Sequence, residues 1–331
     1  MEIKHSTKNE SYESLFEKLQ ANNNKGFIVE FDRLQSVGLS QPRSVALHPS
    51  NAEKNRQDAT YPYDKSRVKF STVENSSDGY INASYIPGHR SETLFIAAQH
   101  PLPGTIDDFW YMIWEQRITT IVMLSHSTEN FQGQGEEYWP KTEAKKCGNI
   151  LAATISENND GGWTIRDIVL SNVKNKKCHQ IRQFHFTEWH ESGEMDNREA
   201  LIQFVYEVRK YKKEDSSNWP TLVHCRTGTV RSGIFIALYC IINQQECGNK
   251  VDVYGIVQKI HLHRPLMVET EDQYIILHRC ALDVVKGKKN VNAEENRQEN
   301  TEERVYELIP NTYSEVQANE SEEPYDRTLH I

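Results

Sequence analysis

Residues 223–233 read Val-His-Cys-Arg-Thr-Gly-Thr-Val-Arg-Ser-Gly, and an apolar run over residues 234–239 follows them. This pattern predicts a strand, a tight loop around Cys225 and a helix that opens directly after the loop. A helix N-terminus offers unpaired backbone N–H groups and a partial positive charge, so the amides of residues 226–231 can converge on the oxygens of an anion. The loop is therefore a candidate phosphate site.

Two side chains of this loop carry the chemistry. Arg231 has a planar guanidinium that can hold two phosphate oxygens at once. Cys225 lies inside the same ring of donors and is expected to be a thiolate, because helix N-termini and nearby cations favour the charged form. Such a nucleophile would point at phosphorus. The plainer interpretation is a buried cysteine in a strand-to-helix turn, with an unrelated arginine six residues further on.

The order His-Cys, five residues, Arg and Ser-Gly resembles the signature of the protein tyrosine phosphatase family. Other stretches match that family in order over roughly residues 26–285, and they are Lys54–Arg56, Pro62–Asp64, Arg67–Val68, Asp78–Ile86, Gln99–Pro103, Asp108–Trp110, Met112–Trp114, Tyr138–Pro140, Arg182–Phe184, Val251–Tyr254 and Met267–Tyr274. The resemblance implies an α/β fold with a central, highly twisted mixed β-sheet flanked by helices. It also implies hydrolysis of phosphotyrosine in proteins through a cysteinyl-phosphate intermediate, with no metal and no other cofactor.

Two substitutions sharpen the resemblance. His100 replaces the glycine of the family's Gln-Gly-Pro motif, and Glu269 replaces the glutamine of its Val-Gln-Thr motif. Variants of this kind look like the second, membrane-distal domain of receptor-type tyrosine phosphatases. Many of those domains are weak or inactive, so the resemblance implies a domain of the same kind here.

Composition limits the class and the location of the chain. The formal charge of −9 over 331 residues argues against nucleic acid as a partner. The six cysteines show no metal-ligand spacing with the 13 histidines, which favours reduced thiols in the cytoplasm and predicts no metal site. No run of 18 apolar residues and no signal peptide are found in the sequence. If the chain is the intracellular part of a receptor, the membrane span lies outside it.

The chain is expected to form one domain with extensions. Residues 1–25 are interpreted as an N-terminal extension, 26–286 as the phosphatase-like domain and 287–331 as an acidic tail. Apolar residues at three- and four-residue spacing predict helices over 8–36, interrupted at Asn22–Asn24. Short β-branched and aromatic runs predict strands at 94–97, 120–124 and 163–165. Further helices are expected at about 105–116, 197–213, 232–245, 251–262 and 270–286.

The tail changes composition after Lys289. Residues 290–331 carry eleven acidic residues against three arginines and have little apolar content, so they are expected to be disordered. Tyr306, Tyr313 and Tyr325 are flanked by acids, and once phosphorylated they could bind SH2-type domains with Arg-based pockets. An acidic solubilising tail with incidental tyrosines remains the alternative.

The general acid of the family is an aspartate in a mobile Trp-Pro-Asp loop. The matching residues here begin with Trp189, His190 and Glu191, so the carboxylate is kept on a side chain one methylene longer. His190 replaces a proline and Met195 stands where a second proline is common, so closure of the loop should cost more ordering entropy. A solvated loop carboxylate is the alternative role for Glu191.

The substrate pocket departs from the family in two further places. Gln57 directly follows Lys54–Arg56, where the family has a tyrosine that stacks on the substrate ring. Asp64 belongs to the matched substrate-loop region. Glu269 replaces the first of two glutamines that position the hydrolytic water, and a carboxylate there would repel phosphate. Gln273 matches the second glutamine.

The phosphate loop itself contains three replacements. Arg226 stands for a serine, Thr227 for an alanine and Val230 for a glycine, and β-branched Val230 is acceptable only if its φ is negative. Ser232 keeps a hydroxyl that can stabilise Cys225 as a leaving group. The phosphate-binding set predicted from the loop is completed by His224, Gly228 and Thr229. Glu129 matches a family glutamate that orients the arginine, although a surface charge is its alternative role.

Two functions follow from these residues. In the first, an active tyrosine phosphatase uses Cys225 as nucleophile, Arg231 as phosphate clamp, Glu191 as acid and Gln273 to assist water. In the second, a regulatory domain keeps the anion site, binds phosphotyrosine proteins and turns over slowly or not at all. The second is favoured, because the departures touch four separate catalytic parts and loss of acid–base help alone costs roughly 10²–10⁴ in rate.

Overall fold

The computed structural model describes residues 11–71, 78–88, 91, 94–125, 137–189, 197–215 and 218–287. The chain divides into a unit Met1–Val285 and a unit Lys286–Ile331, and the account below concerns the first. The predicted tail beyond residue 287, with its three tyrosines, lies outside the described residues.

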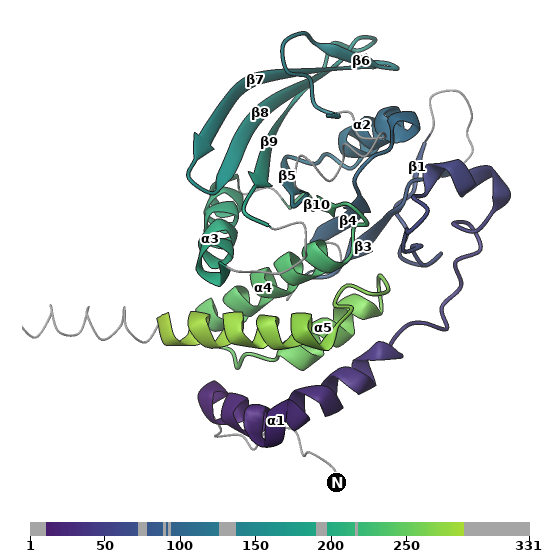
Figure 1. Ribbon diagram of the computed structural model, residues 1–331. Helices are drawn as coiled ribbons and strands as arrows, with labels where there is room; N and C mark the ends of the chain where they lie inside the picture. Colours follow the sequence, from purple (N-terminus) through teal and green to yellow (C-terminus); the bar gives the residue numbers. More distant parts are fainter. Residues whose placement is uncertain are drawn as a thin grey trace, which may run out of the picture. The chain divides into compact units, whose positions relative to one another are not determined.

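Within the described residues, one mixed sheet of eight strands forms the centre of the unit, in the order β3-β4-β10-β5-β9-β8-β7-β6 (Figure 1). The strands are β3 (Ala83–Ile86), β4 (Phe95–Gln99), β5 (Thr120–Met123), β6 (Lys145–Cys147), β7 (Ile150–Asp160), β8 (Trp163–Asn172), β9 (Cys178–Phe186) and β10 (Thr221–Cys225). β10 runs parallel to β4 on one side and to β5 on the other, whereas β3, β6, β7 and β8 pair antiparallel. β1 (Phe70–Ser71) and β2 (Asp78–Gly79) make a separate two-stranded sheet.

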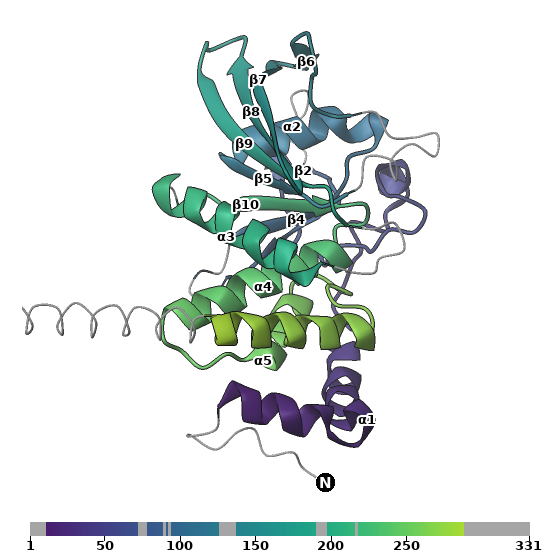
Figure 2. The ribbon, with the colours of Figure 1, turned by 60° about the vertical axis from the view of Figure 1, so that its left-hand side comes forward.

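Helices cover both faces of this sheet, so the predicted α/β fold is confirmed. They are α1 (Tyr12–Gln35), α2 (Ile106–Glu115), α3 (Arg198–Asp215), α4 (Val230–Glu246), α5 (Val253–His261), a helix over residues 271–287, and the short 3₁₀ helices η1 (Pro49–Lys54) and η2 (Pro103–Thr105). One apolar cluster joins the sheet to α3, α4 and α5, and a second joins the opposite face to α2. Figure 2 shows α3 and α4 against the sheet, with α1 beyond them.

The alternation of side chains along β10 determines which face of the sheet Cys225 and His224 occupy. Val223 and Cys225 belong to the cluster beneath α4, whereas Leu222 belongs to the cluster beneath α2. His224 therefore faces α2, where its ring lies 5.7 Å from that of Phe109. Because the central parallel strand ends at Cys225, the loop that follows it emerges at the carboxyl edge of the sheet, where sites of open α/β folds lie.

α1 contains the interruption that the sequence predicts. Asn22, Asn23 and Asn24 take left-handed backbone angles, with φ of 55°, 58° and 63°. Asparagine tolerates this region better than other residues that carry a Cβ atom. The chain then packs back so closely that a Cβ atom on Gly26 would lie 2.5 Å from the Cα of Leu19.

Both halves of α1 dock on the helix over 271–287. Tyr274 donates a hydrogen bond to Glu30 at 2.8 Å, and the hydroxyl of Tyr12 lies 2.8 Å from Nδ1 of His278. All four side chains are buried. The predicted boundary at residue 26 thus falls inside a helix whose two halves both pack on the main core.

Candidate active site

Cys225 lies where a strand, a short loop and a helix follow one another, as the sequence pattern predicts. β10 ends at Cys225, and α4 begins at Val230, so four residues span the turn. Cys225 is buried, and Oγ of Ser232, in the first turn of α4, donates a hydrogen bond to its Sγ at 3.3 Å. Val230 begins the helix and is absent from the residues with positive φ, so its branched side chain fits the backbone there.

Gly228 determines the shape of the loop. Its φ is +69°, a value that favours glycine, and a Cβ atom would lie 2.3 Å from the carbonyl carbon of Ala98 in β4. Its N–H donates to the carbonyl of Cys225 at 3.2 Å. The amide of Gly228 was predicted to face the anion, but it donates to a carbonyl within the loop itself.

Substitution of Gly228 by alanine is expected to lower the free energy of unfolding and to abolish anion binding. A left-handed residue with a Cβ atom and a clash with the backbone of β4 together cost about 2–5 kcal/mol. Urea unfolding and sulfate titration would measure both effects. Gly104→Ala is the matched control, because a Cβ atom at Gly104 meets nothing within 4 Å. Equal shifts in the two variants would contradict this role of Gly228.

A buried arginine that the sequence reasoning missed supports the loop from beneath. Arg264 is fully buried, and its guanidinium donates to the carbonyls of Gly228 at 2.8 Å and Thr227 at 3.1 Å. It also donates to Oδ1 of Asn82 at 2.6 Å and to Oγ of Ser84 at 3.1 Å. Burial lowers the pKa of Arg264 to about 10, so the group is still charged at neutral pH.

Arg231 lies at the edge of the site. Its side chain is 9% exposed, and Nη1 donates to the carbonyl of Leu124 at 3.1 Å. The guanidinium lies 5.6 Å from the ring centre of Trp189, the buried residue that precedes the predicted acid loop. The structure thus brings the predicted clamp to the start of that loop. The predictions for Glu129, His190, Glu191 and Met195 lie outside the described residues.

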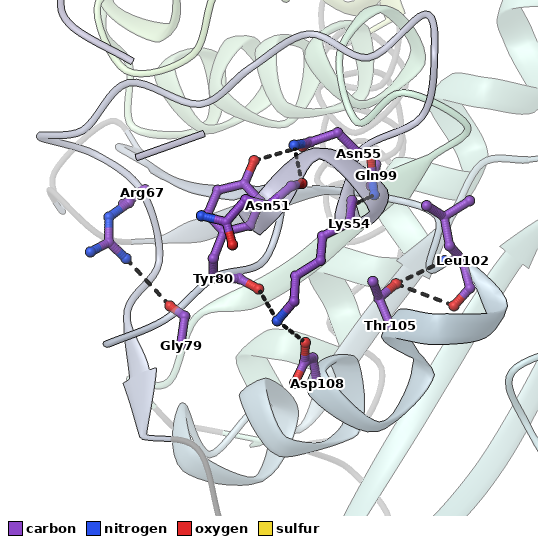
Figure 3. Close-up of polar contacts among 10 residues, drawn as sticks. All are labelled: Asn51, Lys54, Asn55, Arg67, Gly79, Tyr80, Gln99, Leu102, Thr105 and Asp108. Atoms are coloured by element: carbon purple, nitrogen blue, oxygen red, sulfur yellow. Dashed lines mark hydrogen bonds and ion pairs between the residues drawn. The ribbon is translucent and has the colours of Figure 1, made fainter. Parts of the chain in front are cut away.

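The substrate-loop region is held by a network centred on Asn55 (Figure 3). Oδ1 of Asn55 accepts a hydrogen bond from the hydroxyl of Tyr80 at 2.6 Å. It also accepts one from the side-chain amide of Asn82 at 2.9 Å. Lys54 forms an ion pair with Asp108 in α2 at 2.8 Å, and Gln99 donates to the Lys54 carbonyl at 2.7 Å. This network fixes the turn that carries Gln57, which is itself exposed.

Asp64 and Gln273 have local structural contacts. Both carboxylate oxygens of Asp64 accept backbone N–H groups, from Ser44 at 2.9 Å and Val45 at 3.0 Å. Oε1 of Gln273 accepts from the amides of Glu269 at 2.9 Å and Thr270 at 3.3 Å, while Oγ1 of Thr270 accepts from the Gln273 amide at 3.3 Å. This is a capping box at the start of the helix over 271–287. Its Thr-x-x-Gln spacing is visible in the sequence.

Two buried histidines lie behind the loop. The N–H of His100 donates to the carbonyl of Cys225 at 2.8 Å, and its ring lies 5.4 Å from that of His224. Nε2 of His224 is 2.9 Å from the hydroxyl of Tyr138, whereas neither ring nitrogen of His100 has a hydrogen-bond partner within the described part of the chain. Burial, with a contribution from Arg56, lowers the pKa of His100 to about 3, and burial also lowers the pKa of His224.

Among the described residues, no three histidine, cysteine or carboxylate side chains are arranged to hold a metal ion. No helix in the same ranges is long and apolar enough to cross a membrane.

Comparison with known proteins identifies the family. The family model described as protein-tyrosine phosphatase matches residues 51–283. Receptor-type tyrosine-protein phosphatase eta of Homo sapiens is 45% identical over 300 residues, which cover 91% of this chain and 22% of that protein. Receptor-type tyrosine-protein phosphatase V of Rattus norvegicus is 37% identical over 83% of this chain and 16% of its own length. Phosphatidylinositol phosphatase PTPRQ of Homo sapiens is 38% identical over 82% and 12%.

The chain therefore belongs to the protein-tyrosine phosphatase family, as its phosphate-loop signature predicts. It spans less than a quarter of the length of these receptor-type and phosphatidylinositol phosphatase relatives.

Proposed function

We propose that this domain binds phosphotyrosine of proteins at the loop Cys225–Arg231 and hydrolyses it slowly or not at all. The observation that carries the proposal is a contrast within the site. The backbone of the loop is held by Arg264, which donates hydrogen bonds to the carbonyls of Gly228 and Thr227. The turn beside it carries an exposed Gln57 in place of an aromatic ring. Anion binding depends on the loop, whereas turnover of an aryl ester depends also on the turn that carries Gln57.

Two further residues support weak turnover. Glu269 is an exposed carboxylate at the start of the helix over 271–287, and its charge would oppose a phosphate dianion. The side-chain carbonyl of Gln273 already accepts two backbone amides, so positioning water would require it to leave the capping box. Removing a side chain from a helix cap typically costs about 1 kcal/mol in free energy of unfolding.

The location and the partners complete the proposal. Because two of the relatives named above are receptor-type phosphatases, we propose that this chain lies in the cytoplasm as part of a longer receptor. The variants His100 and Glu269 support the second, regulatory phosphatase-like part of such a receptor. Phosphorylated Tyr306, Tyr313 and Tyr325 would recruit SH2-type domains to it.

A second candidate, an active tyrosine phosphatase, is favoured by one contact. The hydrogen bond from Ser232 to Cys225 is the contact that a cysteinyl leaving group would use. In that case Cys225 attacks phosphorus, the tyrosine oxygen leaves with a proton from Glu191, and water then releases phosphate and the thiol. Hydrolysis of an aryl phosphate by the wild type and by Cys225→Ser separates the two candidates.

Replacement of Arg231 by lysine is expected to weaken vanadate and sulfate binding by about tenfold or more, because a single ammonium cannot reproduce a bidentate fork. Isothermal titration of both anions would measure this. Arg198→Lys serves as the control, because Arg198 is a partly exposed arginine that pairs with Asp283. Unchanged binding in Arg231→Lys would place the anion elsewhere and overturn the proposed site.

A further inference from the structure

A turn of the substrate loop is fastened to the phosphate loop by an ion pair. The N–H of Ala59 donates to the carbonyl of Arg56 at 3.0 Å, so Gln57 and Asp58 form the corner of this turn. The carboxylate of Asp58 pairs with the guanidinium of Arg226, the residue that follows Cys225. The two side chains are 49% and 45% exposed, so the pair lies at the mouth of the site.

A second arginine belongs to the same group of charges. Nη2 of Arg56 donates to the carbonyl of His100 at 3.2 Å, and the N–H of His100 contacts the carbonyl of Arg226 at 3.3 Å. Nε of Arg56 is buried and has no hydrogen-bond partner among the described residues. After burial, the nearby charge of Arg226 lowers the pKa of Arg56, while Asp58 raises it. Asp58 therefore pairs with Arg226, and Arg56 lies close enough for both charges to affect its pKa.

The carboxylate of Asp58 indicates what kind of ligand Arg226 and Arg56 can bind. Asp58 presents a carboxylate on a short side chain, carried by an exposed turn of polypeptide. A ligand peptide that carries an acidic residue near its phosphorylated tyrosine would present the same group to the same arginines. Arginine is the cation best suited to exchange one carboxylate for another, because its fork matches either partner.

We propose that Arg226 and Arg56 form a second anion subsite beside the phosphate loop, which Asp58 occupies in the free protein and which binds an acidic residue of a phosphotyrosine peptide. This proposal rests on the proposed function, since the phosphate must first be held at Cys225–Arg231. Exchange of Asp58 for a ligand carboxylate leaves the number of ion pairs unchanged, so the wild type gains little from an acidic ligand. Removal of the charge of Asp58 leaves the subsite open and makes the acidic ligand the better one.

The test compares two peptides with three proteins. Both peptides carry a phosphonate analogue of phosphotyrosine that is not hydrolysed, and they differ only in having glutamate or glutamine beside it. The proteins are the full chain as wild type, Asp58→Asn and Arg226→Ser. The expected ratio of affinities, acidic over neutral peptide, is about one in the wild type and in Arg226→Ser. It rises to about three- to fivefold in Asp58→Asn, which is the range that a half-exposed ion pair supplies.

Matched controls separate the subsite from net charge. Glu53→Gln removes one exposed acid from η1, close to the turn in sequence, and Lys65→Ser removes one exposed cation. Neither should change the ratio. The proposal is overturned if the ratio in Asp58→Asn equals that of the wild type, or if the double variant Asp58→Asn, Arg226→Ser keeps the increase. If neither peptide nor inorganic phosphate binds any of these proteins, the proposed function fails as well.

Discussion

Aryl phosphate turnover is expected to rise by orders of magnitude when five family residues are restored together, namely Gln57→Tyr, His190→Pro, Glu191→Asp, Val230→Gly and Glu269→Gln. These changes return ring stacking, shape of the acid loop, proton donation and water placement, and acid–base help alone contributes about 10²–10⁴ in rate. Initial rates with para-nitrophenyl phosphate would measure the gain. Single reversions should do much less, because catalytic groups that act as a unit are not additive.

The five reversions are not expected to contribute equally. Val230 already has a helical backbone at the start of α4, so Val230→Gly relieves no strain and weakens the helix by about 0.5–1 kcal/mol. The same five changes with Cys225→Ser should give no turnover, which is the control for contaminating phosphatases. Turnover of a phosphotyrosine peptide by the unaltered chain at ordinary rates, roughly 1–10³ per second, would refute the impaired-domain proposal.

Mild acid is expected to destabilise the fold strongly. His100 and His278 are buried, and burial lowers the pKa of each to about 3. In the unfolded chain each takes up a proton near pH 6.5, so below that pH the unfolded state binds more protons and the free energy of unfolding falls. Each group contributes at most about 1.4 kcal/mol per pH unit, so the two together cost at most about 4 kcal/mol between pH 6.5 and 5. His224 acts in the same direction.

Urea unfolding at pH 7.5, 6 and 5 would measure this loss. The loss should increase down to about pH 3, where the folded histidines also take up protons, and it should be nearly absent at about pH 7.5, where both states are largely neutral. His100→Phe should reduce the slope of unfolding free energy against pH, whatever its effect on stability at pH 7.5. The control His48→Asn changes an exposed histidine and retains an N-cap for η1. A slope that His100→Phe leaves unchanged would show that His100 is not the group concerned.

The parts of the fold that the sequence predicted are those with local signals. The strand and helix around Cys225 follow from an apolar run, a turn and a second apolar run, and α1 breaks at the asparagines where the periodicity is interrupted. The order of the strands has no such signal. β10 lies between β4 and β5 although it follows both in the chain by about 100 residues or more, and that pairing depends on the packing of the whole sheet.

The candidate site also contains some residues that have a local signal in the sequence and others that have none. Cys225, Arg231 and Ser232 were predicted from their spacing, and the structure shows a hydrogen bond from Ser232 to Cys225 and a hydrogen bond from Arg231 to the carbonyl of Leu124. Arg264 was not, because a single arginine after α5 cannot be told from a surface residue until its burial is known. The pairing of Asp58 with Arg226 spans 168 residues and was equally invisible. The capping box of Gln273 has a local signal, the Thr-x-x-Gln spacing, but the family resemblance implies water placement for the same residue.

The four hydrogen bonds of Arg264 have a consequence for how this loop persists. A buried guanidinium that loses its acceptors leaves an uncompensated charge in the core, which costs about 3–5 kcal/mol and is a large part of the stability of a typical domain. Any change that displaces the carbonyls of Thr227 and Gly228 therefore lowers the stability of the fold, whether or not the domain is an enzyme. A lineage that abandoned turnover would therefore still keep the backbone shape of this loop, on which the proposed phosphate site depends.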